Sequence, residues 1–207
     1  MSIKSMGIIG GGQLGSLLAV AAKKLNINTT IYCDDIDAPA QNFCAKFVYG
    51  RYHDKLKLQE FIKDSDVITY EFENIPYETL NELNKVKPVL PKPSVIRLIQ
   101  HRVAEKDFVN KLNIRTTRYA SIESKSDMEP LGDFLPGILK TTTMGYDGKG
   151  QYPIKKIEEI NNLNIDFSKG YILEKLVKLK KEISVIITRF GNLSLIHISE
   201  PTRQQGI

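Results

Sequence analysis

The N-terminal half of the chain alternates between short apolar runs and stretches in which apolar residues recur at helical spacing. A short run of β-branched, aromatic or apolar residues between turn residues is typical of a β-strand. Four such runs predict strands at residues 6–9, 29–32, 46–49 and 67–70. Helices are predicted between them, marked by Leu14, Leu17, Leu18, Ala21 and Leu25, by Leu56, Leu58, Phe61 and Ile62, and by Leu80 and Leu83.

Strands separated by helices predict a parallel sheet covered on both faces. Residues 89–90 predict a last strand of this sheet, which two prolines close. Ser94 is predicted to cap a helix that runs to Ile99, because a serine oxygen can accept from the free N–H groups of a first turn. A second helical pattern follows over residues 103–112, and we expect this pair of helices to link two domains.

Beyond the linking helices the pattern changes to strand-like runs separated by glycine-containing loops. These runs cover residues 137–140, 151–154, 171–174 and 182–189, with a helical pattern near 157–163. Such a series is typical of an antiparallel α+β unit. We therefore predict an α/β protein with a Rossmann-like parallel-sheet domain at 1–98, linking helices at 99–117 and an α+β domain at 118–192.

Charge and cysteine content narrow the possible partners. The net charge is +5, but the lysines are scattered, and the dense run at residues 175–181 lacks interleaved aromatic residues. We therefore expect small anionic substrates and no nucleic acid. Cys33 and Cys44 have no metal-like spacing and are expected to be reduced thiols. Because no apolar run could span a bilayer and no secretory signal is visible, a cytoplasmic protein without a membrane partner is expected.

A glycine-rich loop at residues 145–151 follows Lys140 closely. With few side chains in the way, such a loop can offer backbone N–H groups to a phosphate chain. Lys140 ends an apolar run and would place a cation beside the same phosphates. The loop also contains Tyr146 and Asp147, which a simple hinge would not need. This combination predicts a nucleotide site that shares a wall with a second substrate.

A second glycine-rich turn, Gly10 to Gly15, satisfies the G-x-G-x-x-G pattern between a predicted strand and a predicted helix. Asp34 and Asp35 lie about twenty residues further on, as a nicotinamide-dinucleotide site requires. The turn presents N–H groups and a helix N-terminus to an anion, and a ribose phosphate would satisfy it as well as a pyrophosphate. A dinucleotide-binding oxidoreductase therefore remains an alternative at this point.

Two acids, Glu71 and Glu73, come directly after the predicted strand at 67–70. In open parallel sheets, ligands bind at the carboxyl ends of the strands. A hydroxyl-rich substrate such as a ribose would supply hydrogen-bond donors to these carboxylates. The histidines His53, His101 and His197 form no cluster in the sequence, so none is assigned to a metal or to proton transfer.

In their order and spacing these segments resemble the 5-(carboxyamino)imidazole ribonucleotide synthase family, ATP-grasp enzymes of purine biosynthesis. The resemblance covers nearly all of the chain up to about residue 192, through residues 8–15, 69–74, 100–106, 140, 145–151 and 174–189. It implies a pre-ATP-grasp first domain and an incomplete ATP-grasp second domain. His101 stands where the family usually carries an aspartate, and the stretch before Gly145 is less basic than usual.

The resemblance implies an ATP-dependent carbon–nitrogen ligase. The family activates bicarbonate with ATP as carboxyphosphate and carboxylates the exocyclic amine of 5-aminoimidazole ribonucleotide, so ATP and Mg²⁺ are the expected cofactors. The implied catalytic residues are Lys140, Tyr146 and Asp147. The implied ATP-binding residues are Arg102, Lys140, Gly145, Tyr146, Asp147, Gly148, Lys149, Gly150, Gln151, Glu174, Lys175, Leu176, Val177 and Glu182. The implied ribotide contacts are Gln13, Leu14, Glu71, Tyr146 and Asp147.

Residues 193–207 look like the translation of a sequencing-library adapter, although their alternation also fits a strand. The family's magnesium ligands are expected further along, so no metal ligand is assigned here and the chain alone is expected to be inactive. The resemblance also implies that full-length members are homodimers. Besides the oxidoreductase, a formate-dependent glycinamide ribonucleotide transformylase and a nucleotide-sensing module without chemistry remain alternatives.

Overall fold

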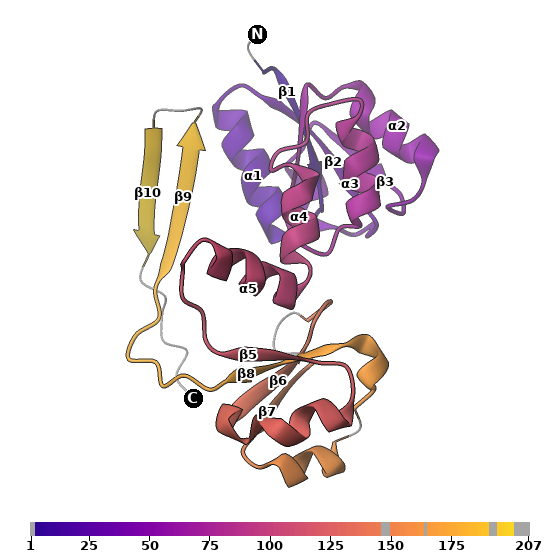
Figure 1. Ribbon diagram of the computed structural model, residues 1–207. Helices are drawn as coiled ribbons and strands as arrows, with labels where there is room; N and C mark the ends of the chain where they lie inside the picture. The colour runs from indigo at the N-terminus through magenta and orange to yellow at the C-terminus, as the bar shows by residue number, and fades with distance from the viewer. Residues whose placement is uncertain (1–2, 146–149, 164, 191–193, 201–207) are drawn as a thin grey trace.

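The computed structural model describes residues 3–145, 150–163, 165–190 and 194–200. The chain forms an N-terminal parallel-sheet domain and a second, antiparallel domain, with two short helices between them (Figure 1). This is the α/β architecture that the sequence predicts. No helix in the described part of the chain is long and apolar enough to cross a membrane.

The first domain is built on four parallel strands in the order β3-β2-β1-β4. Their bounds are β1 Ser5–Ile9, β2 Asn28–Cys33, β3 Lys46–Tyr49 and β4 Val67–Tyr70, each within two residues of the prediction. The prediction of a fifth strand at 89–90 is wrong, because these residues do not form a strand. Val89 makes only a single parallel bridge to Ile68.

Helices cover both faces of this sheet, as predicted. Helix α1 (Gln13–Lys24) packs with a 3₁₀ turn, η1 (Pro39–Asn42), on one face. Helices α2 (Lys55–Lys63) and α3 (Tyr77–Asn84) bury Phe61 and Leu80 on the other. The glycine-rich turn at 10–15 follows the carboxyl end of β1, and the acidic loop that begins at Glu71 follows that of β4. Because β1 and β4 are adjacent strands, the sheet brings the two loops together.

Helix α1 lies where the sequence predicts it, but only part of its leucine pattern faces the sheet. Leu14 and Leu17 are exposed, and the residues that face the sheet are Gly15, Ala19 and Ala22. Small side chains let the helix approach β1 closely. Leu18 packs partly against the core, while Leu14 and Leu17 stay outside. Tertiary packing therefore outweighed the leucine periodicity.

Helices α4 (Pro93–Ile99) and α5 (Arg102–Lys111) link the domains. Ser94 is not the N-cap of α4: Lys92 holds that position, and Pro93 starts the helix because its fixed φ suits the first turn. The N-cap of α5 is His101, whose Nδ1 accepts from Ala104 N at 3.4 Å. The histidine thus takes over a capping role that acids usually fill.

The second domain has four antiparallel strands in the order β5-β8-β6-β7. Their bounds are β5 Tyr119–Ile122, β6 Gly137–Thr141, β7 Gln151–Ile154 and β8 Tyr171–Lys175. The 3₁₀ segments η2 (Lys125–Phe134), η3 (Ile157–Asn162) and η4 (Phe167–Lys169) lie around this sheet. Residues of the sheet, η2 and η3, with Leu139 and Leu173 among them, form the buried core on one face, which leaves the other face of β6 and β8 for a site.

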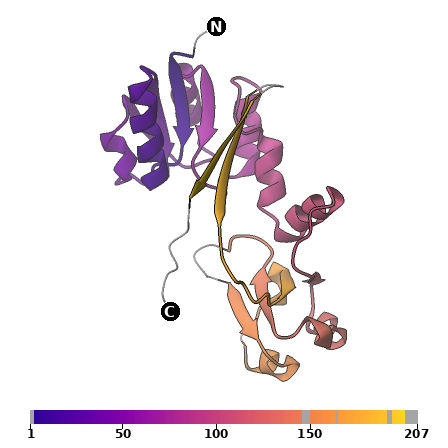
Figure 2. The same cartoon turned by 90° about the vertical axis from the view of Figure 1, so that its left-hand side faces the viewer.

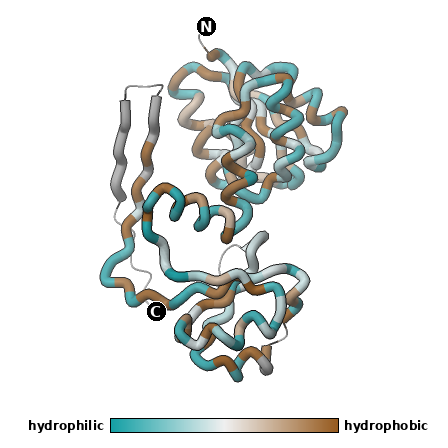
Figure 3. Tube along the Cα trace, viewed as in Figure 1, coloured by the Kyte–Doolittle hydropathy of each residue, from teal (hydrophilic) through white to brown (hydrophobic). Residues whose placement is uncertain are grey.

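Strands β9 (Ser184–Phe190) and β10 (Ser194–Glu200) form a separate antiparallel hairpin, seen edge-on in Figure 2. Hydrophobic residues stay exposed in β9 and in the segment before it, where Figure 3 shows brown stretches. They are Leu179, Ile183, Val185 and Ile187. The alternation at 194–200 is sufficient to form this strand whatever its origin.

Candidate active site

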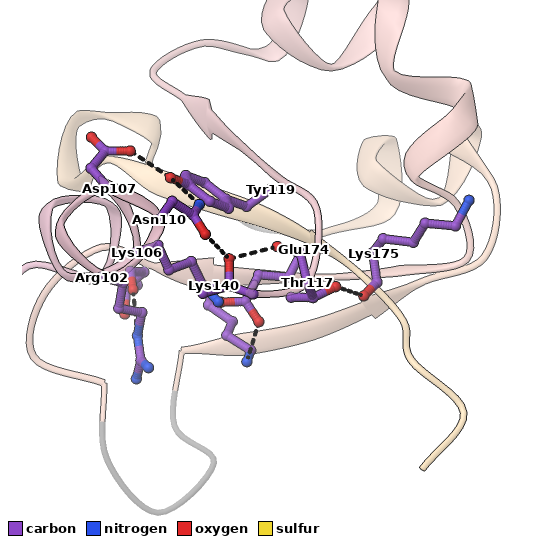
Figure 4. Close-up of polar contacts among 11 residues, drawn as sticks. Arg102, Lys106, Asp107, Asn110, Thr117, Tyr119, Lys140, Glu174 and Lys175 are labelled. Atoms are coloured by element: carbon purple, nitrogen blue, oxygen red, sulfur yellow. Dashed lines mark hydrogen bonds and ion pairs between the residues drawn. The ribbon is translucent and has the colours of Figure 1, made fainter. Parts of the chain in front are cut away.

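The centre of the second domain's open face is an ion cluster of Lys140, Glu174 and Lys106. Lys140 Nζ lies 2.8 Å from Glu174 Oε2, and Lys106 Nζ lies 3.3 Å from Glu174 Oε1 (Figure 4). The antiparallel register pairs Ile138 with Glu174, and alternation puts Ile138, Lys140 and Glu174 on the same face. Helix α5 delivers Lys106 from above this face. The three residues come from three elements, so the fold itself assembles the cluster.

Burial and charge act in opposite directions on Glu174, which is 9% exposed. Burial alone would raise the pKa of its carboxyl, but the ammonium groups of Lys140 and Lys106 outweigh it and hold the pKa below its usual value. Lys106 also lies 5.6 Å above the Tyr119 ring. The cluster leaves one net positive charge beside the glycine-rich loop, fixed in position by the shared carboxylate.

Arg102 ties the start of α5 to the strand that carries Lys140. Its Nε donates to Thr141 O at 3.1 Å, its Nη2 to Gly145 O at 2.7 Å, and its backbone N to Thr142 O at 2.9 Å. A guanidinium has five N–H donors, so these bonds leave further donors for an anion. Arg102 therefore both shapes the entry to the loop and keeps a charge there.

Both ends of the glycine-rich loop lie next to Lys140. Gln151 pairs with Lys140 in the β6–β7 ladder, and Gly150 O accepts from Thr141 N at 3.0 Å. Gly150 has φ +69, and a Cβ there would lie 2.8 Å from Thr141 Oγ1, so a glycine is required. The sequence expectations for Tyr146, Asp147, Gly148 and Lys149 fall outside the described residues.

The predicted hinge continues from Glu174 along an apolar cavity of about 460 Å³. Ile138 and Leu176 line it, with Pro136, Gly137, Pro153, Ile154 and Lys155. The Lys175 side chain points away from Lys140 and donates to Asp133 O at 2.7 Å, while Leu176 N donates to Pro136 O at 2.9 Å (Figure 4). Val177 is exposed, and Glu182 lies further along the exposed segment before β9.

The glycine turn of the first domain differs from the sequence expectation. Two of the N–H groups that were expected to face an anionic ligand, Gly12 N and Gly15 N, donate to the Glu71 carboxylate, the first at 2.7 Å. Gly10 has φ +104, and a Cβ there would collide with the same side chain. The turn thus holds Glu71 beside Gln13 and Leu14, which are both exposed.

The acidic loop after β4 and the segment before Gly145 face each other across the domain boundary. A cavity of about 540 Å³ is lined by Asn74, Pro76, Tyr77, Glu78, Arg97, Gln100, Thr143 and Met144. A smaller one of about 80 Å³ beside it adds Glu73, Ile99, Arg102, Glu105, Thr142 and Gly145. Of the site residues expected from the sequence, Arg102 and Gly145 line this cleft, whereas Lys140, Glu174, Gln13, Leu14 and Glu71 are not among its lining residues. In the described part of the chain, no three His, Cys, Asp or Glu side chains are grouped to hold a metal.

Sequence reasoning assigned no role to two residues of this site. Lys106 and Gln100 both lie in the block at 100–106, but a lysine or glutamine on a helical pattern is normally a surface residue. The contact between Lys106 and Glu174 depends on how α5 crosses the sheet, which periodicity alone does not determine. The only available signal was their position within a block that also contains Arg102.

Comparison with known proteins defines the class of protein. Residues 3–100 match the family model of the ribonucleotide synthetase preATP-grasp domain, and residues 107–207 match that of the ATP-grasp domain. Together with the buried lysine–glutamate cluster beside a glycine-rich loop, these matches define an ATP-grasp protein.

Individual relatives narrow the class further. The N5-carboxyaminoimidazole ribonucleotide synthase of Brucella melitensis is 35% identical over 98% of this chain and 58% of its own length. That of Bacillus subtilis is 36% identical over 90% of this chain and 50% of its own. The crystal structure of N5-carboxyaminoimidazole synthetase from Staphylococcus aureus complexed with ADP superposes with TM-score 0.90 at 29% identity, covering 98% of this chain and 55% of that one.

The chain therefore belongs to the N5-carboxyaminoimidazole ribonucleotide synthase family of ATP-grasp ligases. It spans about half the length of the curated synthases that it matches.

Proposed function

We propose that the protein to which these two domains belong carboxylates 5-aminoimidazole ribonucleotide with ATP and bicarbonate, through carboxyphosphate. The observation that carries this proposal is the buried Lys140–Glu174–Lys106 cluster next to the ends of a glycine-rich loop, whose first residue, Gly145, lines a cleft with Glu73 of the other domain. Phosphoryl transfer needs mainly positioning and charge neutralisation, and such a cluster supplies both.

ATP would lie along the open face of the second domain. Its adenine suits the apolar cavity between Ile138 and Leu176, next to the hinge at residues 174–177, and Glu182 would approach the nucleotide ribose. Lys140 and Arg102 would hold the phosphates with the loop at 145–151. The Staphylococcus aureus relative is complexed with ADP, which supports nucleotide binding by the protein to which this chain belongs.

The ribotide would lie against the first domain. The Glu71 carboxylate can accept about four hydrogen bonds, and two are taken by Gly12 N and Gly15 N, so ribose hydroxyls can use the others. Gln13 and Leu14 are exposed beside it. Tyr146 and Asp147 would face the same substrate from the second domain.

In this arrangement the residues act by binding and orientation. Lys140 and Arg102 would neutralise phosphate charge as bicarbonate attacks the γ-phosphoryl group and ADP leaves. Exclusion of water would protect the resulting carboxyphosphate until its carboxyl group passes to the ribotide amine, which loses a proton, and inorganic phosphate leaves. Magnesium would supply charge neutralisation at the phosphates when bound, but the described side chains group no ligands for it, so no step is assigned to it here.

A dinucleotide-binding oxidoreductase fits less well. Glu71 occupies the amides against which a dinucleotide pyrophosphate would have to lie, and like charges at that position repel. The other alternative, formate-dependent glycinamide ribonucleotide transformylation, would differ from the proposed reaction in its ribotide and in its one-carbon donor. We further propose that the whole protein is a cytoplasmic homodimer and that residues 193–207 take no part in its function.

Isothermal titration of the 207-residue chain tests the proposal. We expect binding of Mg-ADP and of 5-aminoimidazole ribonucleotide, with no binding of NADH and no turnover by this chain alone. Lys140→Ala should weaken ADP binding at least about tenfold, while Lys125→Ala, a change at an exposed lysine of the same domain outside the proposed site, should not. Binding of NADH without ADP would contradict the proposed function.

A further inference from the structure

The junction between α4 and α5 holds loops of both domains through two nearby side chains. Gln100, which follows α4, donates through Nε2 to Glu73 O at 2.7 Å and to Ile75 O at 2.6 Å. Arg102, the first residue of α5, donates to carbonyls in the segment 141–145. One junction therefore fixes the loop after β4 and the loop after β6 at the same time.

The chemistry of Gln100 is specific. A carboxamide nitrogen has two N–H donors, and both are directed at backbone carbonyls of the acidic loop. Glutamate at this position would have the same size but no donor, and methionine would be neutral but without either bond. Gln100 also lines both cavities between the domains, so it lies where ribotide and nucleotide loops meet.

We propose that Gln100 is a positioning residue that couples ribotide binding in the first domain to nucleotide binding in the second. The inference rests on the proposed function, because it needs both ligands. A ribotide that holds the loop at 71–75 would fix the Gln100 contacts and, because only His101 separates Gln100 from Arg102, the Arg102 contacts on the other side. The nucleotide would then meet an ordered loop entry and would bind more tightly. By linkage, the nucleotide strengthens ribotide binding by the same factor.

The test measures the Kd of Mg-ADP by isothermal titration, with and without saturating 5-aminoimidazole ribonucleotide, in the full 207-residue chain. We expect the ribotide to tighten ADP binding about fivefold or more in the wild type. In Gln100→Glu and Gln100→Met this ratio should fall to within about twofold of unity, while the Kd of ADP alone stays within about threefold of wild type. Gln59→Glu, at an exposed position of α2, makes the same change outside the junction and should keep the wild-type ratio.

The outcomes separate the inference from the function it rests on. A coupling ratio that is absent in the wild type, or unchanged in both Gln100 variants, overturns the role of Gln100. An equal loss in Gln59→Glu overturns it as well. Failure of the wild type to bind the ribotide at all overturns the proposed function and the inference with it. Should Gln100→Glu fail to fold by circular dichroism, Gln100→Met gives the same comparison without the added charge.

Discussion

Replacing Glu174 by glutamine would remove the one negative charge between two lysines while keeping the size of the side chain. Glu174 Oε2 is 2.8 Å from Lys140 Nζ, Oε1 is 3.3 Å from Lys106 Nζ, and none of the three side chains is more than 18% exposed. The variant would leave two ammonium groups close together without a counter-charge. We therefore predict a clear loss of stability in the second domain.

The magnitude follows from the burial of the cluster. Removing one partner of a buried ion pair costs about 3–5 kcal/mol, whereas an exposed pair contributes about 0–1 kcal/mol. The side chains of Lys106 and Lys140 are 17% and 18% exposed, so we expect the free energy of unfolding to fall by about 2–4 kcal/mol at pH 7. For a chain of this size, that corresponds to a fall in Tm of roughly 5–15 °C.

The pH dependence gives a second, independent signature. The folded-state pKa of Glu174 lies below the unfolded value of about 4.3, although burial opposes this, because the two lysines favour the charged form. Its stabilisation is therefore complete above the unfolded pKa and disappears as the pH falls through the folded pKa. Wild type and Glu174→Gln should differ at pH 7 and converge in acid.

Urea denaturation followed by far-UV circular dichroism, from pH 7 to about pH 3, measures both effects. Glu129→Gln, a change at an exposed carboxylate of the same domain, is the matched control and should behave as wild type throughout. The reasoning is refuted if Glu174→Gln unfolds within about 0.5 kcal/mol of wild type at pH 7. A difference that persists unchanged in acid would equally contradict it.

Three further perturbations test other parts of the account. Gly10→Ala should lower the free energy of unfolding by about 2–4 kcal/mol, because φ is +104 and the new Cβ meets Glu71. Gly132→Ala, with open space around it, should change the free energy of unfolding by less than about 1 kcal/mol. Equal effects of the two substitutions would contradict this reasoning. Asp54→Ala should cost about 1 kcal/mol in thermal unfolding, because Asp54 caps α2 through Leu56 N and Lys57 N, and Asp54→Asn should restore most of it. Lys106→Met should weaken ADP binding about threefold or more through loss of the Glu174 anchor, and an unchanged Kd from titration would show that Lys140 needs no such support.

Much of the fold could be predicted because hydrophobic periodicity reports burial directly. The runs that became β1, β2 and β4 place apolar, aromatic or β-branched residues on both faces, as is typical of strands in a covered parallel sheet. The leucines that marked α1 were a poorer guide to its buried face, for a physical reason. The helix packs through Gly15 and Ala19, whose small size permits close contact but gives little hydrophobic signal. The strand β5 was missed because its four residues include only one fully buried apolar side chain.

The candidate site was predictable in its parts but less in its contacts. Lys140 and the ends of the glycine-rich loop were placed correctly near each other because they are neighbours in the sequence. The contact of Lys106 with Glu174, and that of Glu71 with the Gly10–Gly15 turn, join residues far apart in the chain, and only strand order and register bring them together. The ligand roles of these residues and the domain boundaries at 98, 117 and 192 stay predictions.

Chemical-shift mapping of Mg-ADP on the ¹⁵N-labelled chain tests the central claim most directly, because it reports which of the two glycine-rich turns receives the nucleotide. The account predicts large shifts for the amides of Lys140, Gly145, Gly150 and Leu176, and little change at Gly12 and Gly15, whose N–H groups already donate to Glu71. Large shifts at Gly12 and Gly15 with none around Lys140 would place the nucleotide on the first domain and contradict it.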